Sequence, residues 1–359
     1  MINDLKGGAK VSTPAFACAS GCSAVIQRLH KYARGFIHLA MGKIKVFVAD
    51  SIAKEGIEEF GRFKDIELVV KTGLAPTDLA AALGDSEGLV VRSATKATRE
   101  IIQAGAKLKV IGRAGAGVDN IDVPAATEKG ILVLNTPGGN AEGAGELAIA
   151  MMFAVARQIP QANASMKAGT WDKKTFAGGV ELYGKTLGLI GIGFVGSVVA
   201  ARAVGLGMKV IAYDPYAPKD KAKSLGITLG SLDDVFKAAD FISIHSPKND
   251  ETKGMINAGA FAKMKKGVYL INCARGGIVV EKDLIAALDG GQVKAAGVDV
   301  YDKEPPEDWS LAKHPKVVAT PHLGASTNES QVTVSIMIAK QMGAYLTKGE
   351  VINAVNKVK

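Results

Sequence analysis

The sequence is poor in cysteine, with only three among 359 residues. Cys18, Cys22 and Cys273 are too few and too unevenly spaced for a disulfide framework, so nothing requires an oxidising compartment. Long apolar runs are missing as well, because no stretch approaches the roughly 18 to 20 residues that span a bilayer. We therefore expect a cytoplasmic protein and not an integral membrane protein.

The chain also lacks a basic stripe interleaved with aromatic residues, so nucleic-acid binding is not expected. Part of the net charge of +9 lies in residues 1–43, where six Lys and Arg residues stand against Asp4 alone, a net +5. The remaining excess suits anionic small molecules. With 48% apolar and 22% charged residues, the composition is that of a globular protein long enough for two domains.

Residues 1–42 differ in composition from the rest. Their apolar residues recur at the spacing of one face of a basic amphipathic helix: Val25, Ile26, Leu29, Tyr32, Ala33, Phe36 and Ile37. Three interpretations are open: an upstream addition with Met41 as the natural start, an organelle-targeting segment, or a helix packed on the body. Scarce arginine and Asp4 near the start fit targeting poorly. We favour the first interpretation.

From Ile44 onward, short β-branched runs alternate with helix-period stretches, which predicts parallel sheets with helices on both faces. A long apolar helix is expected from 144 to 158, stopped by Pro160. The alternation restarts after Tyr183, and a last helix follows Ser326 or Thr327 as N-cap. The predicted strands are 44–49, 89–92, 108–112, 131–134, 187–190, 210–213, 241–245, 268–272, 295–299 and 317–320.

A glycine loop, residues 191–196 (Gly-Ile-Gly-Phe-Val-Gly), follows one apolar strand directly and leads into a helix. Glycines at these positions permit a tight turn, close approach of the backbone to a pyrophosphate and close helix packing. Asp214 ends the next strand, where a carboxylate can bind the ribose hydroxyls of adenosine and repel a 2′-phosphate. We expect NAD rather than NADP. The alternative is a plain glycine turn beside an exposed aspartate.

Three further segments, 272–277, 299–305 and 320–327, follow in order, and with them the chain resembles the D-2-hydroxyacid dehydrogenases from about residue 43 to 359. Segments 91–96 and 112–120 are similar to those of the phosphoglycerate dehydrogenases within that family. The resemblance implies an α/β protein with two doubly wound domains. A flavodoxin-like substrate domain would comprise 43–140 and 325–359, and a Rossmann NAD domain 141–324. It also implies a homodimer and a short form without the regulatory domain of longer members.

Oxidation of a 2-hydroxy acid needs a base for the hydroxyl proton and a cation for the carboxylate. His322 is the candidate base, because imidazole titrates near neutral pH. By resemblance, Glu304 would hold the other ring nitrogen and Arg275 would grip the substrate carboxylate. Taken singly, they could be a loop histidine, a solvated turn residue and a surface charge. Their occurrence together at strand ends favours the catalytic interpretation.

The resemblance assigns further residues to the two ligands. Phe194 departs from it, because many relatives have an arginine there that touches the pyrophosphate. Cys273 is expected to contact the dinucleotide through its backbone. The cofactor residues are Thr95, Gly191, Gly193, Phe194, Val195, Gly196, Asp214, Ser246, Cys273, Ala274, Arg275, Asp299, His322, Gly324 and Ala325. The substrate residues are Arg92, Ser93, Arg113, Ala114, Gly115, Arg275 and His322. Lys96 lies in the same segment as Arg92, but a solvated surface role is favoured for it over a phosphate contact. No metal is expected.

These assignments predict NAD-dependent oxidation of D-3-phosphoglycerate to 3-phosphohydroxypyruvate, a step of serine biosynthesis. The nearest alternative is a glyoxylate or hydroxypyruvate reductase, which shares the catalytic residues and needs no phosphate contact. A second alternative is a non-enzymatic, NAD-binding module similar to the dehydrogenase-like corepressors. The segment from Arg92 to Lys96 disfavours the last of these.

Overall fold

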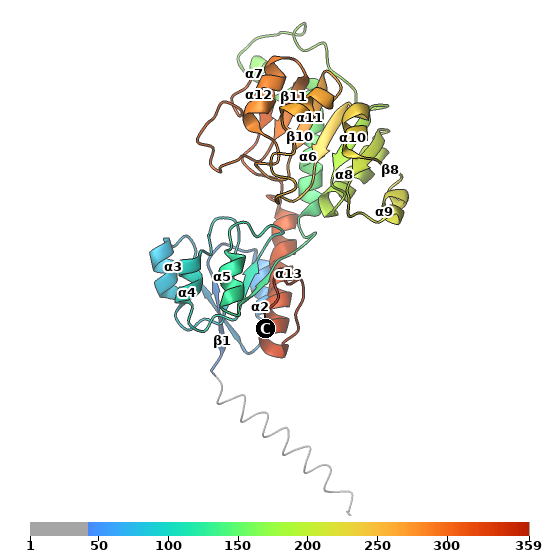
Figure 1. The fold of residues 1–359 in the computed structure, drawn as a ribbon. Helices are drawn as coiled ribbons and strands as arrows, with labels where there is room; N and C mark the ends of the chain where they lie inside the picture. The colour runs from blue at the N-terminus through green and yellow to red at the C-terminus, as the bar shows by residue number, and fades with distance from the viewer. Residues whose placement is uncertain (1–41, 359) are drawn as a thin grey trace, which may run out of the picture. The chain divides into compact units, whose positions relative to one another are not determined.

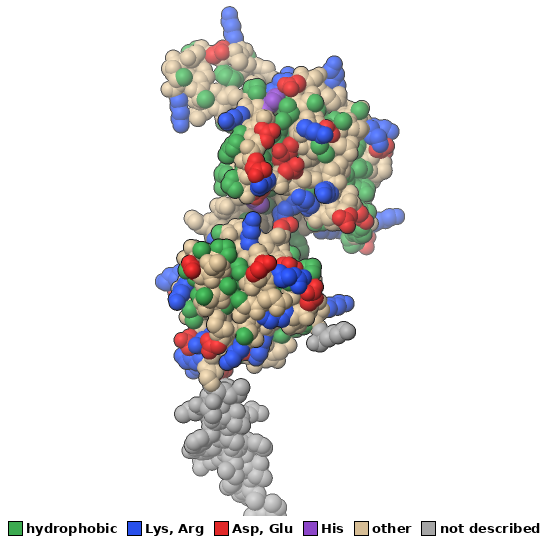
Figure 2. Space-filling model, turned by 60° about the vertical axis from the view of Figure 1, so that its left-hand side comes forward, with side chains coloured by type: hydrophobic (Ala, Val, Ile, Leu, Met, Phe, Trp, Pro, Cys, Tyr) green, Lys and Arg blue, Asp and Glu red, His purple; other side chains and the backbone are tan. Residues whose placement is uncertain are grey.

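The computed structural model describes residues 42–358. The helix expected in residues 1–42, and the three interpretations of it, therefore lie outside the described residues except for Gly42. Within residues 42–358, no helix combines the length and the apolar character required to cross a membrane. On the face that Figure 2 shows, Lys and Arg side chains are interspersed with Asp and Glu rather than gathered into one patch.

The first sheet has five strands in the order β2-β1-β3-β4-β5, and the pairs β1–β3, β3–β4 and β4–β5 are parallel. Its strands are β1 (Ile44–Val48), β2 (Ile66–Val70), β3 (Gly88–Val91), β4 (Val110–Arg113) and β5 (Leu132–Leu134). Its helices are α2 (Lys54–Phe60), α3 (Pro76–Leu83), α4 (Arg99–Ala104), α5 (Val123–Glu128) and α13 (Asn328–Lys348).

Alternate side chains of these strands face different helices, as the period of a strand requires. Phe47 and Ile111 belong to the core with α3, α4 and α5, whereas Val46 and Val110 belong to the core with α2 and α13. Figure 1 shows the last helix, α13 in red, beside α2 of this first sheet. The sheet is therefore covered on both faces, as predicted.

The second sheet has seven parallel strands in the order β12-β11-β10-β9-β6-β7-β8. The strands are β6 (Thr186–Ile190), β7 (Lys209–Tyr213), β8 (Thr228–Leu229), β9 (Phe241–Ile244), β10 (Val268–Asn272), β11 (Val293–Val298) and β12 (Val317–Ala319). One core packs α10 (Leu232–Ala238), α11 (Ala258–Lys263) and α12 (Glu281–Asp289) on the sheet; another packs α6 (Ala141–Arg157), α8 (Phe194–Gly205) and α9 (Lys219–Ser224).

Both strand orders reverse direction next to the first strand of the sheet, between β1 and β3 and between β6 and β9. Doubly wound sheets bind ligands at the carboxyl ends of the strands beside such a reversal. The predicted fold class of two doubly wound parallel sheets is confirmed. The predicted domain boundaries at 140/141 and 324/325 stay predictions.

Two helix boundaries refine the sequence expectations. Pro160 does not end helical structure: Gln158 adopts a left-handed conformation (φ 50°), and a new helix, α7 (Ile159–Lys167), starts with the proline in its first turn. Proline is favoured there because the first turn needs no N–H donor from it. Of the two N-caps proposed for the last helix, the structure uses Thr327, whose side chain accepts a hydrogen bond from Ser330 N.

Candidate active site

The glycine loop leads from β6 into α8, and its three glycines differ in their surroundings. Gly191 has φ 92°, and a Cβ on it would lie 2.9 Å from the His245 backbone. A Cβ on Gly196 would lie 2.1 Å from the Gly191 carbonyl oxygen. A Cβ on Gly193 would meet nothing within 4 Å, so this position faces open space at the start of α8. This arrangement fits a pyrophosphate approaching the free N–H groups of the helix.

Asp214 follows β7 and accepts hydrogen bonds from Ile192 N (2.9 Å) and Tyr216 N (3.0 Å). It lines a cavity of about 240 Å³ together with Gly191, Gly193 and Ser246. Its carboxylate is therefore fixed beside the loop, where an adenosine ribose would lie. The cavity and loop together fit the expected dinucleotide.

Phe194 opens α8 and stays 62% exposed. Its ring lies against Gly138, where a Cβ would come within 2.9 Å of it. It carries no charge toward a pyrophosphate, so main-chain N–H groups have to supply more of that contact.

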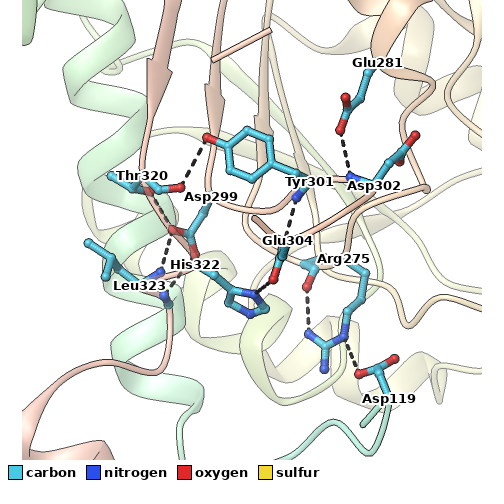
Figure 3. A network of polar contacts seen from close by, with 12 residues as sticks. Asp119, Arg275, Glu281, Asp299, Tyr301, Asp302, Glu304, Thr320, His322 and Leu323 are labelled. Carbon is cyan, nitrogen blue, oxygen red and sulfur yellow. Dashed lines mark hydrogen bonds and ion pairs between the residues drawn. The ribbon is translucent and has the colours of Figure 1, made fainter. Parts of the chain in front are cut away.

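His322 and Glu304 form a hydrogen-bonded pair, with 2.6 Å between the imidazole Nδ1 and Oε2 (Figure 3). Burial alone would raise the pKa of Glu304, but hydrogen bonds from His322 and from Tyr301 N outweigh it, so this pKa lies below its usual value. The carboxylate is therefore ionised at neutral pH and fixes the proton on Nδ1. Nε2 remains for a substrate.

Asp299 holds the loop that carries His322. It is fully buried, and its Oδ1 accepts from Thr320 Oγ1 (2.6 Å) and Leu323 N (2.7 Å), while Oδ2 accepts from Gly324 N (2.9 Å). Its main-chain oxygen accepts from His322 N (2.8 Å). These bonds keep His322 in a left-handed conformation (φ 55°), which non-glycine residues seldom adopt. The contact of Asp299 with the cofactor, which the resemblance predicts on its nicotinamide side, stays a prediction.

Arg275 follows β10 and is partly exposed. Its Nε donates to Asp119 Oδ2 (3.1 Å) and its Nη1 to the carbonyl oxygen of Ala274 (2.7 Å). Figure 3 shows the guanidinium on the same side of the network as the His322 ring. Its charge also contributes to the lowered pKa of Glu304.

A cavity of about 230 Å³ brings together many of the residues predicted for the substrate. It is lined by Arg92, Ser93, Arg113, Ala114, Gly115, Glu304, His322 and Ala325, and also by Asn140, Pro321, Ser326, Gln331 and Val334. Burial, followed by the charges of Arg275 and Arg92, lowers the pKa of Arg113 to about 10. A buried guanidinium near two other positive charges is unfavourable unless an anion binds beside it.

Arg275 and the remaining predicted residues do not line this cavity, and Ser246 lines the cavity beside Asp214 instead. Thr95 donates its hydroxyl to Asp50 (2.7 Å), which also accepts from Arg92 N and so shapes the predicted substrate loop. Lys96 is exposed. Cys273 is buried, and burial followed by the charge of Asp299 raises the pKa of its thiol, which therefore remains protonated. Its dinucleotide contact stays a prediction, as do those of Thr95, Val195, Ser246, Ala274, Gly324 and Ala325.

Three residues near the site were missed by sequence reasoning: Asp50, Asp119 and Asn120. The last two stand inside the segment 112–120 that carried part of the resemblance, which was the available signal. Asp50 follows β1, at the carboxyl end of the strand, where a carboxylate can bind neighbouring loops. Among residues 42–358, no group of His, Cys, Asp or Glu is arranged to hold a metal ion.

Comparison with known proteins places this geometry in a family. Residues 149–324 match the model of the D-isomer specific 2-hydroxyacid dehydrogenase, NAD binding domain. The chain is 47% identical over 312 residues to D-3-phosphoglycerate dehydrogenase of Synechocystis sp. and 49% identical over 315 residues to that of Archaeoglobus fulgidus. Each alignment covers 87% of this chain but only 56% and 59% of the relative, so the chain spans little more than half their length.

Solved structures agree. The NAD-bound 3-phosphoglycerate dehydrogenase of Entamoeba histolytica superposes with a TM-score of 0.75 at 32% identity, covering 88% of this chain and all of that one. A glyoxylate reductase from Paecilomyes thermophila superposes with a TM-score of 0.79 at 29% identity, covering 88% and 99%. The protein therefore belongs to the D-isomer specific 2-hydroxyacid dehydrogenases and binds NAD through its second sheet.

Proposed function

We propose that the protein oxidises D-3-phosphoglycerate to 3-phosphohydroxypyruvate with NAD, a step of serine biosynthesis. The observation that supports this substrate is the shared cavity of Arg92, Arg113 and the His322–Glu304 pair. One carboxylate needs one guanidinium, which Arg275 supplies. Two further arginines call for a second anionic group on the same small molecule, and a phosphate has the charge and the acceptors for them.

The chain's own groups divide the work of the reaction. NAD, when bound, would supply the acceptor for the hydride of the substrate. His322 takes the hydroxyl proton at Nε2, because Nδ1 is held by Glu304. Glu304 stabilises the imidazolium that results. Arg275 holds the carboxylate and favours negative charge on the oxygen during the reverse reduction.

A comparison of substrates tests the proposal. Oxidation of NADH is followed with 3-phosphohydroxypyruvate, hydroxypyruvate, glyoxylate and pyruvate, with NADPH as the cofactor control. We expect the highest kcat/KM for the phosphorylated acid with NADH. Equal or better use of glyoxylate or hydroxypyruvate would instead favour the reductase alternative, which the glyoxylate reductase neighbour supports. No turnover with any acid would favour the corepressor-like alternative.

Arg92→Ala tests the phosphate contact itself. Its main-chain N and its Nη1 are bound to Asp50 and Ser51, so the guanidinium is held in place at the cavity wall. Loss of a charged hydrogen bond should raise KM for 3-phosphohydroxypyruvate by roughly 10-fold or more. KM for hydroxypyruvate should not change. Arg62→Ala, an exposed arginine paired with Glu59, is the control. An unchanged KM for the phosphorylated acid would exclude Arg92 as an anchor.

We further propose a cytoplasmic homodimer. Large apolar side chains stand exposed on α7 and in the segment after it, with Ile159 and Met166 about half exposed and Trp171 79% exposed. An exposed apolar surface of this kind typically marks an interface between proteins. Sedimentation of the full chain should give twice the monomer mass, and Met166→Ala with Trp171→Ala should shift it toward the monomer. A wild-type monomer at micromolar concentration would contradict the dimer.

A further inference from the structure

Asp119 is the carboxylate that contacts the guanidinium of Arg275, at 3.1 Å between Oδ2 and Nε (Figure 3). It lies in the loop after β4, whereas Arg275 lies in the loop after β10. The neighbouring Gly117 has no Cβ, and one placed there would lie 2.0 Å from Arg275 Nη2 and 2.7 Å from Asp119 Oδ2. The backbone thus leaves room for this ion pair, which any side chain at Gly117 would disturb.

The pair orients the donors of Arg275. Nε is taken by Asp119, and one Nη1 hydrogen is taken by the carbonyl oxygen of Ala274 (2.7 Å). A guanidinium has five N–H donors in one plane. The Nη2 amino group and the second Nη1 hydrogen remain for a substrate carboxylate. With two donors held on different sides of the plane, the guanidinium cannot turn, so the direction of the remaining donors is fixed as well.

Asn120, the next residue, connects the same loop to residues 92–95, which include the predicted phosphate anchor Arg92. Its Nδ2 donates to the carbonyl oxygens of Arg92 and Thr95, each at 2.6 Å. Adjacent residues thus hold the arginine expected to bind the carboxylate and the loop expected to bind the phosphate. A shift of this loop would change the spacing between the two anion sites.

Asp119 also balances charge. The charges of Arg92 and Arg275 act on Arg113, and the charge of Asp119 opposes that repulsion. Removing one negative charge would make the region more positive and attract anions more strongly.

We propose that Asp119 is a positioning residue for the dehydrogenase reaction: it fixes the guanidinium plane of Arg275 for the substrate carboxylate and restrains the affinity of the site for anions. This inference rests on the proposed function only in taking a 2-oxo or 2-hydroxy acid as the substrate. Its two effects act in opposite directions on turnover and on anion binding. A side chain needed only for folding would weaken both.

The test compares Asp119→Asn with Asp78→Asn, which removes an exposed charge in the first turn of α3. Steady-state rates are measured with NADH, and sulfate serves as the probe of anion binding by competitive inhibition. We expect Asp119→Asn to lower kcat by on the order of 10-fold, since a misplaced group loses rate steeply. The inhibition constant of sulfate should fall about threefold. Asp78→Asn should change neither.

Three outcomes would overturn the inference: an unchanged kcat, weaker sulfate inhibition together with a lower kcat, or a kcat loss that Asp119→Glu does not partly restore. The pH dependence of kcat/KM should keep its inflections, because Asp119 transfers no proton; a moved inflection would assign the effect to the His322–Glu304 pair instead. The wild type is first assayed on all four 2-oxo acids, and the variants on whichever acid it reduces best. A result that the protein does not use the phosphorylated acid is thereby distinguished from a result that Asp119 does not position Arg275.

Discussion

Replacing Asp299 by asparagine should damage both the stability and the turnover of the protein. The carboxylate is fully buried and accepts hydrogen bonds from Thr320 Oγ1, Leu323 N and Gly324 N. An amide keeps one oxygen and turns the other into an N–H donor. In either orientation, one main-chain N–H of Leu323 or Gly324 then faces a donor inside the protein.

The size of the effect follows from these contacts. A buried N–H left without an acceptor costs about 1–3 kcal/mol, and loss of the negative charge weakens the other two hydrogen bonds. We expect Asp299→Asn to lower the free energy of unfolding by roughly 3 kcal/mol. Thr320→Val keeps the carboxylate and removes one hydrogen bond, so it should cost about 1 kcal/mol. The rate should fall further, by on the order of 100-fold, because the loop that holds His322 loses its anchor.

Urea unfolding and steady-state kinetics of both variants measure these quantities. The expected order is wild type, Thr320→Val, then Asp299→Asn, in stability and in kcat. The reasoning would be refuted if Asp299→Asn unfolded within about 1 kcal/mol of the wild type and kept its kcat. A large loss of rate with no loss of stability would instead favour direct contact of Asp299 with the nicotinamide.

Gly196→Ala should unfold at lower temperature, because its Cβ would meet a carbonyl oxygen at 2.1 Å, whereas Gly193→Ala should keep its melting temperature and bind NADH more weakly. Calorimetry and NADH fluorescence titration separate the two. Burial lowers the pKa of His245 from 6.5 to about 4. As the pH falls, the imidazole of the unfolded chain is therefore protonated before that of the folded chain. Above pH 6.5 His245 does not lower the free energy of unfolding, whereas by pH 5 its protonation should lower that free energy by about 2 kcal/mol. Urea unfolding of His245→Gln should lack this part of the pH dependence. Glu304→Gln should lower kcat by roughly 100-fold without weakening NADH binding. The control Glu307→Gln, at an exposed position, should leave both kcat and NADH binding unchanged.

Periodicity and loop chemistry sufficed to predict the fold class. Strands with apolar residues on both faces require cover on both faces, and short strands alternating with helices leave few other topologies. What periodicity could not resolve was the region near Pro160. Apolar spacing continues across the proline, and only the left-handed turn at Gln158 separates the two helices. Such a break depends on a backbone angle that no residue type at that position demands.

For the site, the sequence located residues better than it assigned their contacts. Arg92, Arg113 and His322 line one cavity although they are far apart in the chain, because parallel strands end at a common edge. The partners of these residues were not predictable. Asp50 and Asp119 are aspartates in loops, and sequence alone does not tell which cation or N–H group a loop carboxylate will meet. Spacing along the chain indicates which loops meet at the edge of a sheet, but not which of their side chains pair.

Four carboxylates around the site show why the surroundings, not the residue type, set the role. Asp299 is fully buried and bonded to a hydroxyl and two main-chain N–H groups, so its removal should act on stability and rate together. Glu304 is partly exposed and bound to an imidazole, and its removal should act on rate. Asp119 is exposed beside a guanidinium and should move rate and anion binding in opposite directions. Asp214, fixed by two N–H groups at the edge of the dinucleotide cavity, should act on the choice between NADH and NADPH. If all four substitutions produced the same kinetic pattern, differences in burial and bonding would not be what separates their functions.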